Sequence, residues 1–229
     1  MSAIRFLFFD IDGTLLNAGR AGASAFQRAW SQTFGDPDRE PTLRFHGATD
    51  RGLLAQLFDA AGIEDTPTRR RRFFSTYESL LRGSLDAIDA EPLPGVSDWL
   101  ARVQSAPERL QSALLTGNCQ AGATLKLRRF GLENHFQWGA FGCEDPDRNH
   151  LARLAQQRAS ERSSYPVHGS EILVIGDTVR DVQCAQSIGA RCLGVATGGD
   201  EAETLRREGA DWVAPTLADA PMETILAGR

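Results

Sequence analysis

Short apolar segments that alternate with helical segments constrain the fold of this 229-residue chain more than any other feature. Each apolar segment is rich in aliphatic and aromatic residues and is bounded by Asp, Gly, Thr or Asn, which is typical of buried parallel strands. The predicted strands are residues 4–9, 113–115, 171–175, 191–195 and 212–213, and the predicted helices between them are 121–130, 150–161, 181–188 and 201–208. Repeated strand–helix–strand units predict an α/β fold with a doubly wound, Rossmann-like parallel sheet.

Residues 17–92 follow a different pattern, because they show helical periodicity and contain no good strand. The helical segments are 21–34, 50–61 and 68–85, and a proline-rich boundary at 91–95 ends the region. We therefore predict an α/β core made of residues 1–16 and 93–229, with an all-helical domain of residues 17–92 inserted after the first strand. A small domain on two connections can hinge over a site as a lid.

Composition excludes several classes of protein. A formal net charge of −5 argues against a general nucleic-acid binder, which needs a basic surface. No apolar stretch approaches the ~20 residues that cross a bilayer, and the first apolar segment runs into acidic residues instead of a signal-peptide cleavage site. The four cysteines stand far apart without a CxxC pair, which favours free thiols in a reducing compartment. We expect a cytoplasmic protein that binds neither nucleic acid nor membrane, and the sequence indicates no oligomeric state.

Two carboxylates at alternate positions, Asp10 and Asp12, follow the first predicted strand. Burying charges at the end of an apolar strand is costly unless those charges have a task. One carboxylate can attack phosphorus and form an acyl phosphate, while the other protonates the leaving alcohol and later deprotonates a water molecule. Taken alone, the segment is explained equally well as an acidic turn at a strand end.

Two more predicted strands end in polar residues. Thr116-Gly117-Asn118 offers a hydroxyl, an amide and backbone N–H groups to a phosphate, although an ordinary turn and helix cap would have the same sequence. Asp177 and Asp181 stand four residues apart at a helix start, where their oxygens can meet one hard cation, although Asp181 is also a common kind of residue at a helix N-terminus. Because parallel strands place their carboxyl ends at one edge of a sheet, three such ends favour a shared site over three unrelated turns.

The motifs DxDGT at 10–14, TGN at 116–118 and GDxxxD at 176–181 resemble those of the haloacid dehalogenase superfamily, in its phosphatase branch with a helical cap. The resemblance spans nearly the whole chain. It implies Asp10 as the nucleophile and a Mg²⁺ ligand, and Asp12 as the general acid and base with its backbone carbonyl on the metal. It also implies that Asp177 binds Mg²⁺, that Asp181 supports it from behind, and that Thr116, Gly117 and Asn118 hold the phosphoryl group.

The family also places a basic residue, usually lysine, between its second and last motifs, and two residues here compete for that position. Lys126 is the chain's only lysine, but by residue count it lies roughly 15 Å along a helix from Thr116. Arg148 follows a strand-to-loop segment at the start of the next helix, where the family residue belongs. We predict Arg148, since arginine stays charged and binds phosphate bidentately, although a solvated arginine at a helix start is the plainer alternative.

The resemblance implies a phosphatase for a small phosphorylated metabolite, with 2-phosphoglycolate as the first candidate. Asp12 favours phosphate over halide chemistry, because relatives that displace halide typically lack this second aspartate. Residues 45–51 resemble a cap specificity loop in which Arg51 or His46 would contact the substrate, with Thr49 or Asp50 explained more simply as a helix cap. The alternatives are a sugar phosphomutase with the same aspartyl-phosphate chemistry and a non-catalytic binding protein. No GxGxxG follows the first strand, which argues against a dinucleotide-dependent oxidoreductase.

Overall fold

The computed structural model describes residues 3–35, 43–89 and 91–228, and its centre is a six-stranded parallel sheet. The strands lie in the order β3-β2-β1-β4-β5-β6, so the predicted α/β class is confirmed. Their bounds are β1 Phe6–Phe9, β2 Gln111–Thr116, β3 Gly139–Phe141, β4 Ile172–Gly176, β5 Arg191–Val195 and β6 Trp212–Ala214. Of these, β3 is absent from the predicted strands, because Gly139-Ala140-Phe141 contains no β-branched residue and gives no recognisable apolar segment.

The two faces of the sheet carry separate hydrophobic cores. Successive side chains of a strand point to opposite faces, so Leu7 and Phe9 of β1 join one core and Phe6 and Phe8 the other. The first core includes buried residues of α4 (Val96–Gln104), α5 (Gln120–Arg129) and α9 (Met222–Leu226). The second includes those of α6 (Arg148–Ser163), α7 (Val179–Ser187) and α8 (Ala202–Arg207). Of these helices, α4 and α9 are absent from the prediction.

The strand order places two acidic strand ends side by side. β1 pairs with β2 on one side and with β4 on the other, with Phe9 opposite both Leu114 and Ile175. From β1 the chain adds β2 and β3 on one side of the sheet and then β4, β5 and β6 on the other, so the strand order reverses between β1 and β4. Ligands of open α/β sheets bind in the crevice at the carboxyl ends of the strands at such a point. Asp10 directly follows β1 and Asp177 directly follows β4.

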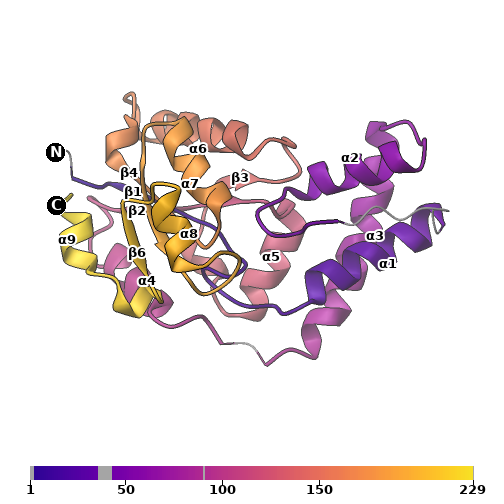
Figure 1. Ribbon diagram of the computed structural model, residues 1–229, viewed down its shortest axis with the longest axis horizontal. Helices are drawn as coiled ribbons and strands as arrows, with labels where there is room; N and C mark the ends of the chain where they lie inside the picture. The colour runs from indigo at the N-terminus through magenta and orange to yellow at the C-terminus, as the bar shows by residue number, and fades with distance from the viewer. Residues whose placement is uncertain (1–2, 36–42, 90, 229) are drawn as a thin grey trace.

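Four helices lie between β1 and β2 in the sequence, and the first three of them lie together beyond the carboxyl edge of the sheet (Figure 1). These three are α1 (Ala21–Phe34), α2 (Asp50–Ala60) and α3 (Pro67–Asp86), close to the predicted helical segments, and we call them the helical insert. Aromatic rings fill the insert, with Phe26 in edge contact with Phe73 and Tyr77 at centroid distances of 4.7 and 5.5 Å. The division of the chain into two domains at residues 16 and 93 stays a prediction.

The start of α2 is hydrogen-bonded directly to the sheet's carboxyl-end loops. The amide of Asp50 donates to the carbonyl of Gly117 at 2.8 Å, and the amide of Arg51 donates to that of Gly142 at 3.0 Å. A Cβ on Gly117 would lie 1.9 Å from the carbonyl oxygen of Ala48, so only glycine permits this approach. The insert therefore closes against the edge of the sheet that carries the acidic residues.

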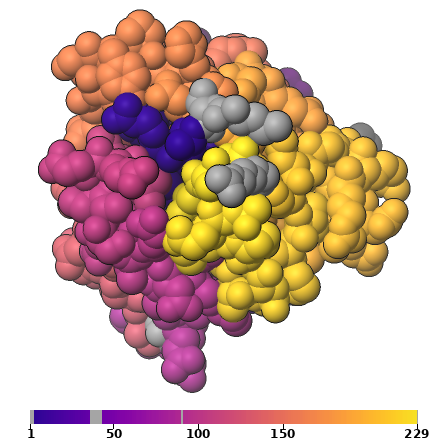
Figure 2. Space-filling view, turned by 90° about the vertical axis from the view of Figure 1, so that its left-hand side faces the viewer, coloured from indigo at the N-terminus to yellow at the C-terminus, as the bar shows by residue number. Residues whose placement is uncertain are grey.

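The first and last described segments meet at the end of the sheet opposite the helical insert (Figure 1), where the N-terminal segment lies beside α9 (Figure 2). The amide of Ile4 donates to the carbonyl of Leu226, and that of Arg5 donates to Glu171. Of the helices within the described ranges, none combines the length and the apolar character that a membrane span requires.

Candidate active site

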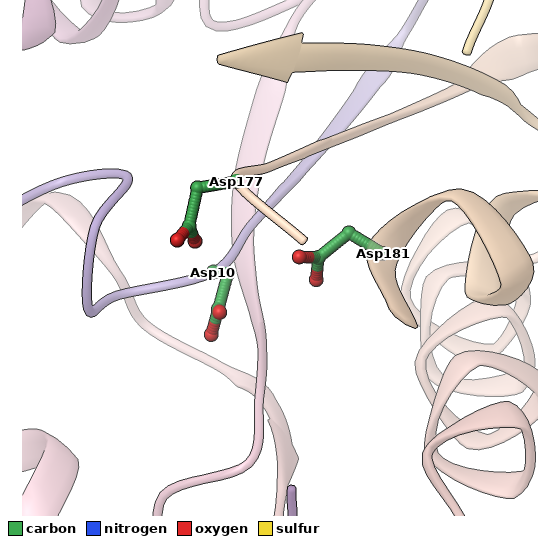
Figure 3. A group of neighbouring side chains, drawn as sticks. All are labelled: Asp10, Asp177 and Asp181. Atoms are coloured by element: carbon green, nitrogen blue, oxygen red, sulfur yellow. The ribbon is translucent and has the colours of Figure 1, made fainter. Parts of the chain in front are cut away.

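Three buried carboxylates meet at the carboxyl ends of β1 and β4. Asp10, Asp177 and Asp181 each offer an oxygen, and these oxygens all lie within 4.8 Å of one another. Asp10 and Asp177 come from the loops after their strands, and Asp181 comes from the first turn of α7 (Figure 3). The structure therefore brings together acids that are 167 and 4 positions apart in the chain, as the sheet-edge argument predicts.

Burial makes this cluster electrostatically unfavourable. Desolvation raises the pKa of Asp177 well above its usual range, and the neighbouring charges of Asp181 and Asp10 raise it further. Desolvation also raises the pKa of Asp181, while the Arg148 guanidinium acts in the opposite direction. The ionised cluster holds three negative charges against one buried cation. It thus fits a divalent cation, whose hard charge carboxylate oxygens prefer.

Arg148 is the cation inside this cluster. Arg148 is 6% exposed, and its guanidinium lies 3.3 Å from Asp10 Oδ2 and forms a second ion pair with Asp181 Oδ1. These two carboxylates raise the pKa of Arg148 against the opposing effect of burial, which is the largest single influence and lowers it. Asp147 caps α6 by accepting from the amide of Asn149, which sets Arg148 as the first residue of the helix. The structure therefore does not place Arg148 on a solvated surface.

A tight turn after β1 holds Asp177 in place. Thr14 Oγ1 donates to Asp177 Oδ1 at 3.2 Å, and the amide of Gly199 donates to Oδ2. Gly13 has φ +79°, and a Cβ there would lie 2.3 Å from Asp177 Oδ2. The glycine of the DxDGT motif is thus required both by its left-handed backbone and by the carboxylate beside it.

A second polar network joins the ends of β1 and β2. Asn118 Nδ2 donates to Asp12 Oδ2 at 2.8 Å and to Thr116 Oγ1 at 2.9 Å. Thr116 is fully buried, whereas the side chain of Asp12 is 44% exposed. Asp12 thus lies at the solvent-exposed side of the site, which we call its wet side, while Asp10 lies at the buried side, which we call its dry side.

Lys126 belongs to this second network, which the sequence argument did not expect. Its Nζ lies 2.5 Å from Asp12 Oδ2 and donates to Asn118 Oδ1 at 2.7 Å. The expected separation was too long because it counted from Thr116, whereas α5 begins at Gln120, only six residues before Lys126. Six residues rise about 9 Å, and a helical side chain leans back toward the N-terminus, so the long lysine stem covers that distance. Both basic candidates therefore reach the site.

A partly open cavity of about 150 Å³ lies between these residues and the helical insert. Gly22, Phe26 and Tyr77 of the insert form part of its wall, and His46 lines it from the loop before α2. Further residues at the cavity are Asp10, Asp12, Gly117, Asn118, Lys126, Arg148, Asp177 and Asp50, and burial raises the pKa of Asp50 to about 6.

Residues 45–51, which form the loop before α2 and its first two residues, have only some of their side chains at the cavity. His46 lines the cavity, and its role as a specificity residue stays a prediction. Arg51 instead donates from its guanidinium to the carbonyl of Glu144 at 2.7 Å, so the structure places it on a core loop outside the cavity lining. Thr49 is the N-cap of α2 and accepts from the amide of Gly52, which is the simpler of the two predicted roles.

Comparisons with known proteins agree with this geometry. The model of a family described as haloacid dehalogenase-like hydrolases matches residues 7–195. The chain is 25% identical to a phosphoglycolate phosphatase of Synechococcus elongatus, over 93% of each chain. It is 27% identical to a phosphorylated carbohydrates phosphatase of Thermotoga maritima, over 89% of this chain and 91% of that one. A variant of CbbY from Rhodobacter sphaeroides, solved with xylulose-(1,5)-bisphosphate, shares the fold with a TM-score of 0.73 at 18% identity, covering 95% of this chain and 96% of that chain.

Proposed function

The chain belongs to the haloacid dehalogenase-like hydrolase family as a phosphoric monoester hydrolase, and from this premise we propose a Mg²⁺-dependent phosphatase that works through a phospho-Asp10 intermediate. The observation that carries the proposal is the buried cluster of Asp10, Asp177 and Asp181 around Arg148 at the carboxyl edge of the sheet. A non-catalytic protein would gain nothing from three carboxylates whose burial disfavours their charge.

In the first step, an Asp10 carboxylate oxygen attacks phosphorus while the bond from phosphorus to the substrate's ester oxygen breaks. The electron pair of that bond goes to the leaving oxygen, which takes a proton from Asp12. Asp12 is proposed for this task because it lines the cavity and stands two residues from the proposed nucleophile. Thr116, Gly117 and Asn118 at the end of β2 are proposed to hold the phosphoryl oxygens.

In the second step, water attacks the phosphorus of the aspartyl phosphate. Asp12 accepts the proton of this water, the bond from phosphorus to Asp10 breaks, and inorganic phosphate leaves with Asp10 restored as a carboxylate. Arg148 offsets negative charge in both steps, since it pairs with Asp10 and faces the same cavity. Its buried Nε–H has no acceptor among the residues that the structure describes.

We assign the divalent cation as Mg²⁺, held by Asp10, Asp177 and the backbone carbonyl of Asp12, with Asp181 supporting it through Arg148 and Thr178. When bound, the cation would neutralise charge on the phosphate and on the cluster. Asp181 suits a supporting role because it already accepts from both the amide and the hydroxyl of Thr178 at 3.0 and 2.7 Å.

The substrate is proposed to be a small phosphomonoester, because the cavity that receives the leaving group has a volume of only about 150 Å³. Helices α1 to α3 would act as a cap over it, with His46 from the loop before α2 at the organic part of the substrate. 2-Phosphoglycolate is the first compound to test, since two relatives that match more than nine-tenths of this chain are phosphoglycolate phosphatases. We also expect the protein to act in the cytoplasm.

Removing the metal is expected to abolish phosphate release. The purified protein with Mg²⁺ should hydrolyse 2-phosphoglycolate or a generic aryl phosphate, and EDTA should reduce kcat/KM by at least about 10³-fold, since the buried carboxylates then repel the phosphate. Excess Mg²⁺ should restore the activity, while Ca²⁺ at the same concentration serves as the control for ionic strength.

Unchanged turnover in EDTA would contradict the metal assignment. The same reaction carried out with a sugar monophosphate and monitored for a phosphorylated sugar isomer tests the phosphomutase alternative, in which a sugar hydroxyl replaces water.

A further inference from the structure

The one lysine of the chain, Lys126, is buried, and its ammonium donates hydrogen bonds to two residues of the site. The side chain of Lys126 is 4% exposed, and its ammonium contacts Asp12 Oδ2 and Asn118 Oδ1. A buried ammonium is costly unless it is paired, so these contacts explain how the residue is tolerated but not what it contributes.

These contacts fix the orientation of the Asp12 carboxylate. Its Oδ2 accepts from Lys126 Nζ at 2.5 Å and from Asn118 Nδ2 at 2.8 Å. Within the described part of the chain, no donor is hydrogen-bonded to the other oxygen, Oδ1, and Asp12 lines the cavity. Two donors on one oxygen orient the carboxyl plane, so Oδ1 is the oxygen that remains for a proton transfer inside the cavity.

The chain has 25 Lys and Arg residues, and all of them except Lys126 are arginine. The limited space around the Lys126 ammonium explains why this position holds lysine instead of arginine. A Cβ on Gly22 of the helical insert would lie 3.3 Å from Lys126 Nζ, and Tyr77 lies beside the same point. A planar guanidinium is larger than an ammonium and needs room for its fork of five donors. The site therefore takes a compact cation with a long stem.

From these observations we propose that Lys126 is a positioning residue, which together with Asn118 holds Asp12 so that Oδ1 points at the leaving oxygen of the substrate. This proposal rests on the proposed phosphatase function and assigns Lys126 a task separate from that of Arg148. Arg148 pairs with the nucleophile at the dry side of the site, whereas Lys126 pairs with the proposed acid at the wet side. The two cations thus serve the two carboxylates of one reaction.

Leaving-group dependence separates positioning of an acid from a structural role. Phenyl phosphate needs a proton on its leaving oxygen, whereas 2,4-dinitrophenyl phosphate releases a stable anion that needs none. In Lys126→Met, kcat/KM for phenyl phosphate is expected to fall about 10²-fold or more, and for 2,4-dinitrophenyl phosphate by a much smaller factor. The ratio kcat/KM is the right quantity because it reports attack on the substrate and not the later release of phosphate by water.

Three comparisons complete the experiment. Asp12→Asn should show the same selective loss, and adding Lys126→Met to it should change the leaving-group dependence little further. Arg128→Met removes a positive charge from an exposed position of the same helix and should leave both substrates unaffected. Equal losses on both substrates in Lys126→Met would overturn the positioning role while leaving the phosphatase intact. A wild-type protein that hydrolyses neither substrate would instead refute the proposed function itself.

Discussion

Replacing Asp10 with Asn is expected to reduce kcat for phosphomonoester hydrolysis by at least about 10⁴-fold, since the amide is isosteric but cannot attack phosphorus. Asp10 is 6% exposed and packs against Asp177, Asp181 and Arg148, so the loss of one negative charge from an overcharged cluster should not prevent folding. Phosphate release by the purified variant, measured beside its thermal unfolding midpoint, checks both expectations.

The matched control for Asp10→Asn is Asp59→Asn, the same chemical change at an exposed position of α2. It should retain wild-type kcat and KM. Full activity in Asp10→Asn would sink the assignment of the nucleophile and would leave Asp12 as the next carboxylate to consider.

The second large effect is expected at Arg148, where Ala should reduce kcat/KM by about 10³-fold. The guanidinium pairs with both Asp10 and Asp181, so its loss leaves the attacking carboxylate and the phosphate to repel each other. Removing one partner from a buried ion pair also typically costs about 3–5 kcal/mol of unfolding free energy, so the variant should be less stable to urea in the absence of metal.

Arg148→Lys keeps the positive charge and therefore the fold, yet an ammonium on a lysine stem differs in shape and reach from the planar guanidinium, whose Nη2 contacts both Asp10 and Asp181. We expect its kcat/KM to fall between those of Arg148→Ala and the wild type. Arg153→Ala, at an exposed position of the same helix, is the control and should behave as the wild type. Near-normal kcat/KM in Arg148→Ala, combined with a large loss in Lys126→Ala, would reverse the roles of the two cations.

The sequence predicts those parts of the site that depend on sheet topology. Asp10 follows β1, Thr116 ends β2 and Asp177 follows β4, and β1 pairs with both of the other strands. Parallel strands must bring their carboxyl ends to one edge of the sheet. Arg148 could be placed for a similar reason, since it begins the helix that follows β3. In each case backbone topology alone brings the residue to the site, and no knowledge of side-chain direction is needed.

Lys126 could not be placed in that way. Its contact with Asp12 depends on which face of α5 meets the site, where α5 begins and how far a lysine stem extends. The only sequence signal for Lys126 was compositional, because it is the sole lysine of a chain rich in arginine. Helix periodicity alone did not indicate in which direction its side chain points. Arg51 shows the opposite case, because this residue of the first turn of α2 was expected at the substrate but donates instead to the carbonyl of Glu144.

Direct detection of the phosphoryl group on Asp10 tests the central proposal most sharply. The protein is mixed with 2-phosphoglycolate and Mg²⁺, quenched in acid and reduced with borohydride, which converts an aspartyl phosphate to homoserine and releases phosphate. Trypsin cleaves after Arg5 and Arg20, and the resulting peptide 6–20 contains both Asp10 and Asp12, which fragmentation in a mass spectrometer distinguishes. We predict homoserine at position 10 and unmodified aspartate at position 12. Continued turnover with no modified residue, or homoserine at position 12, would contradict the mechanism.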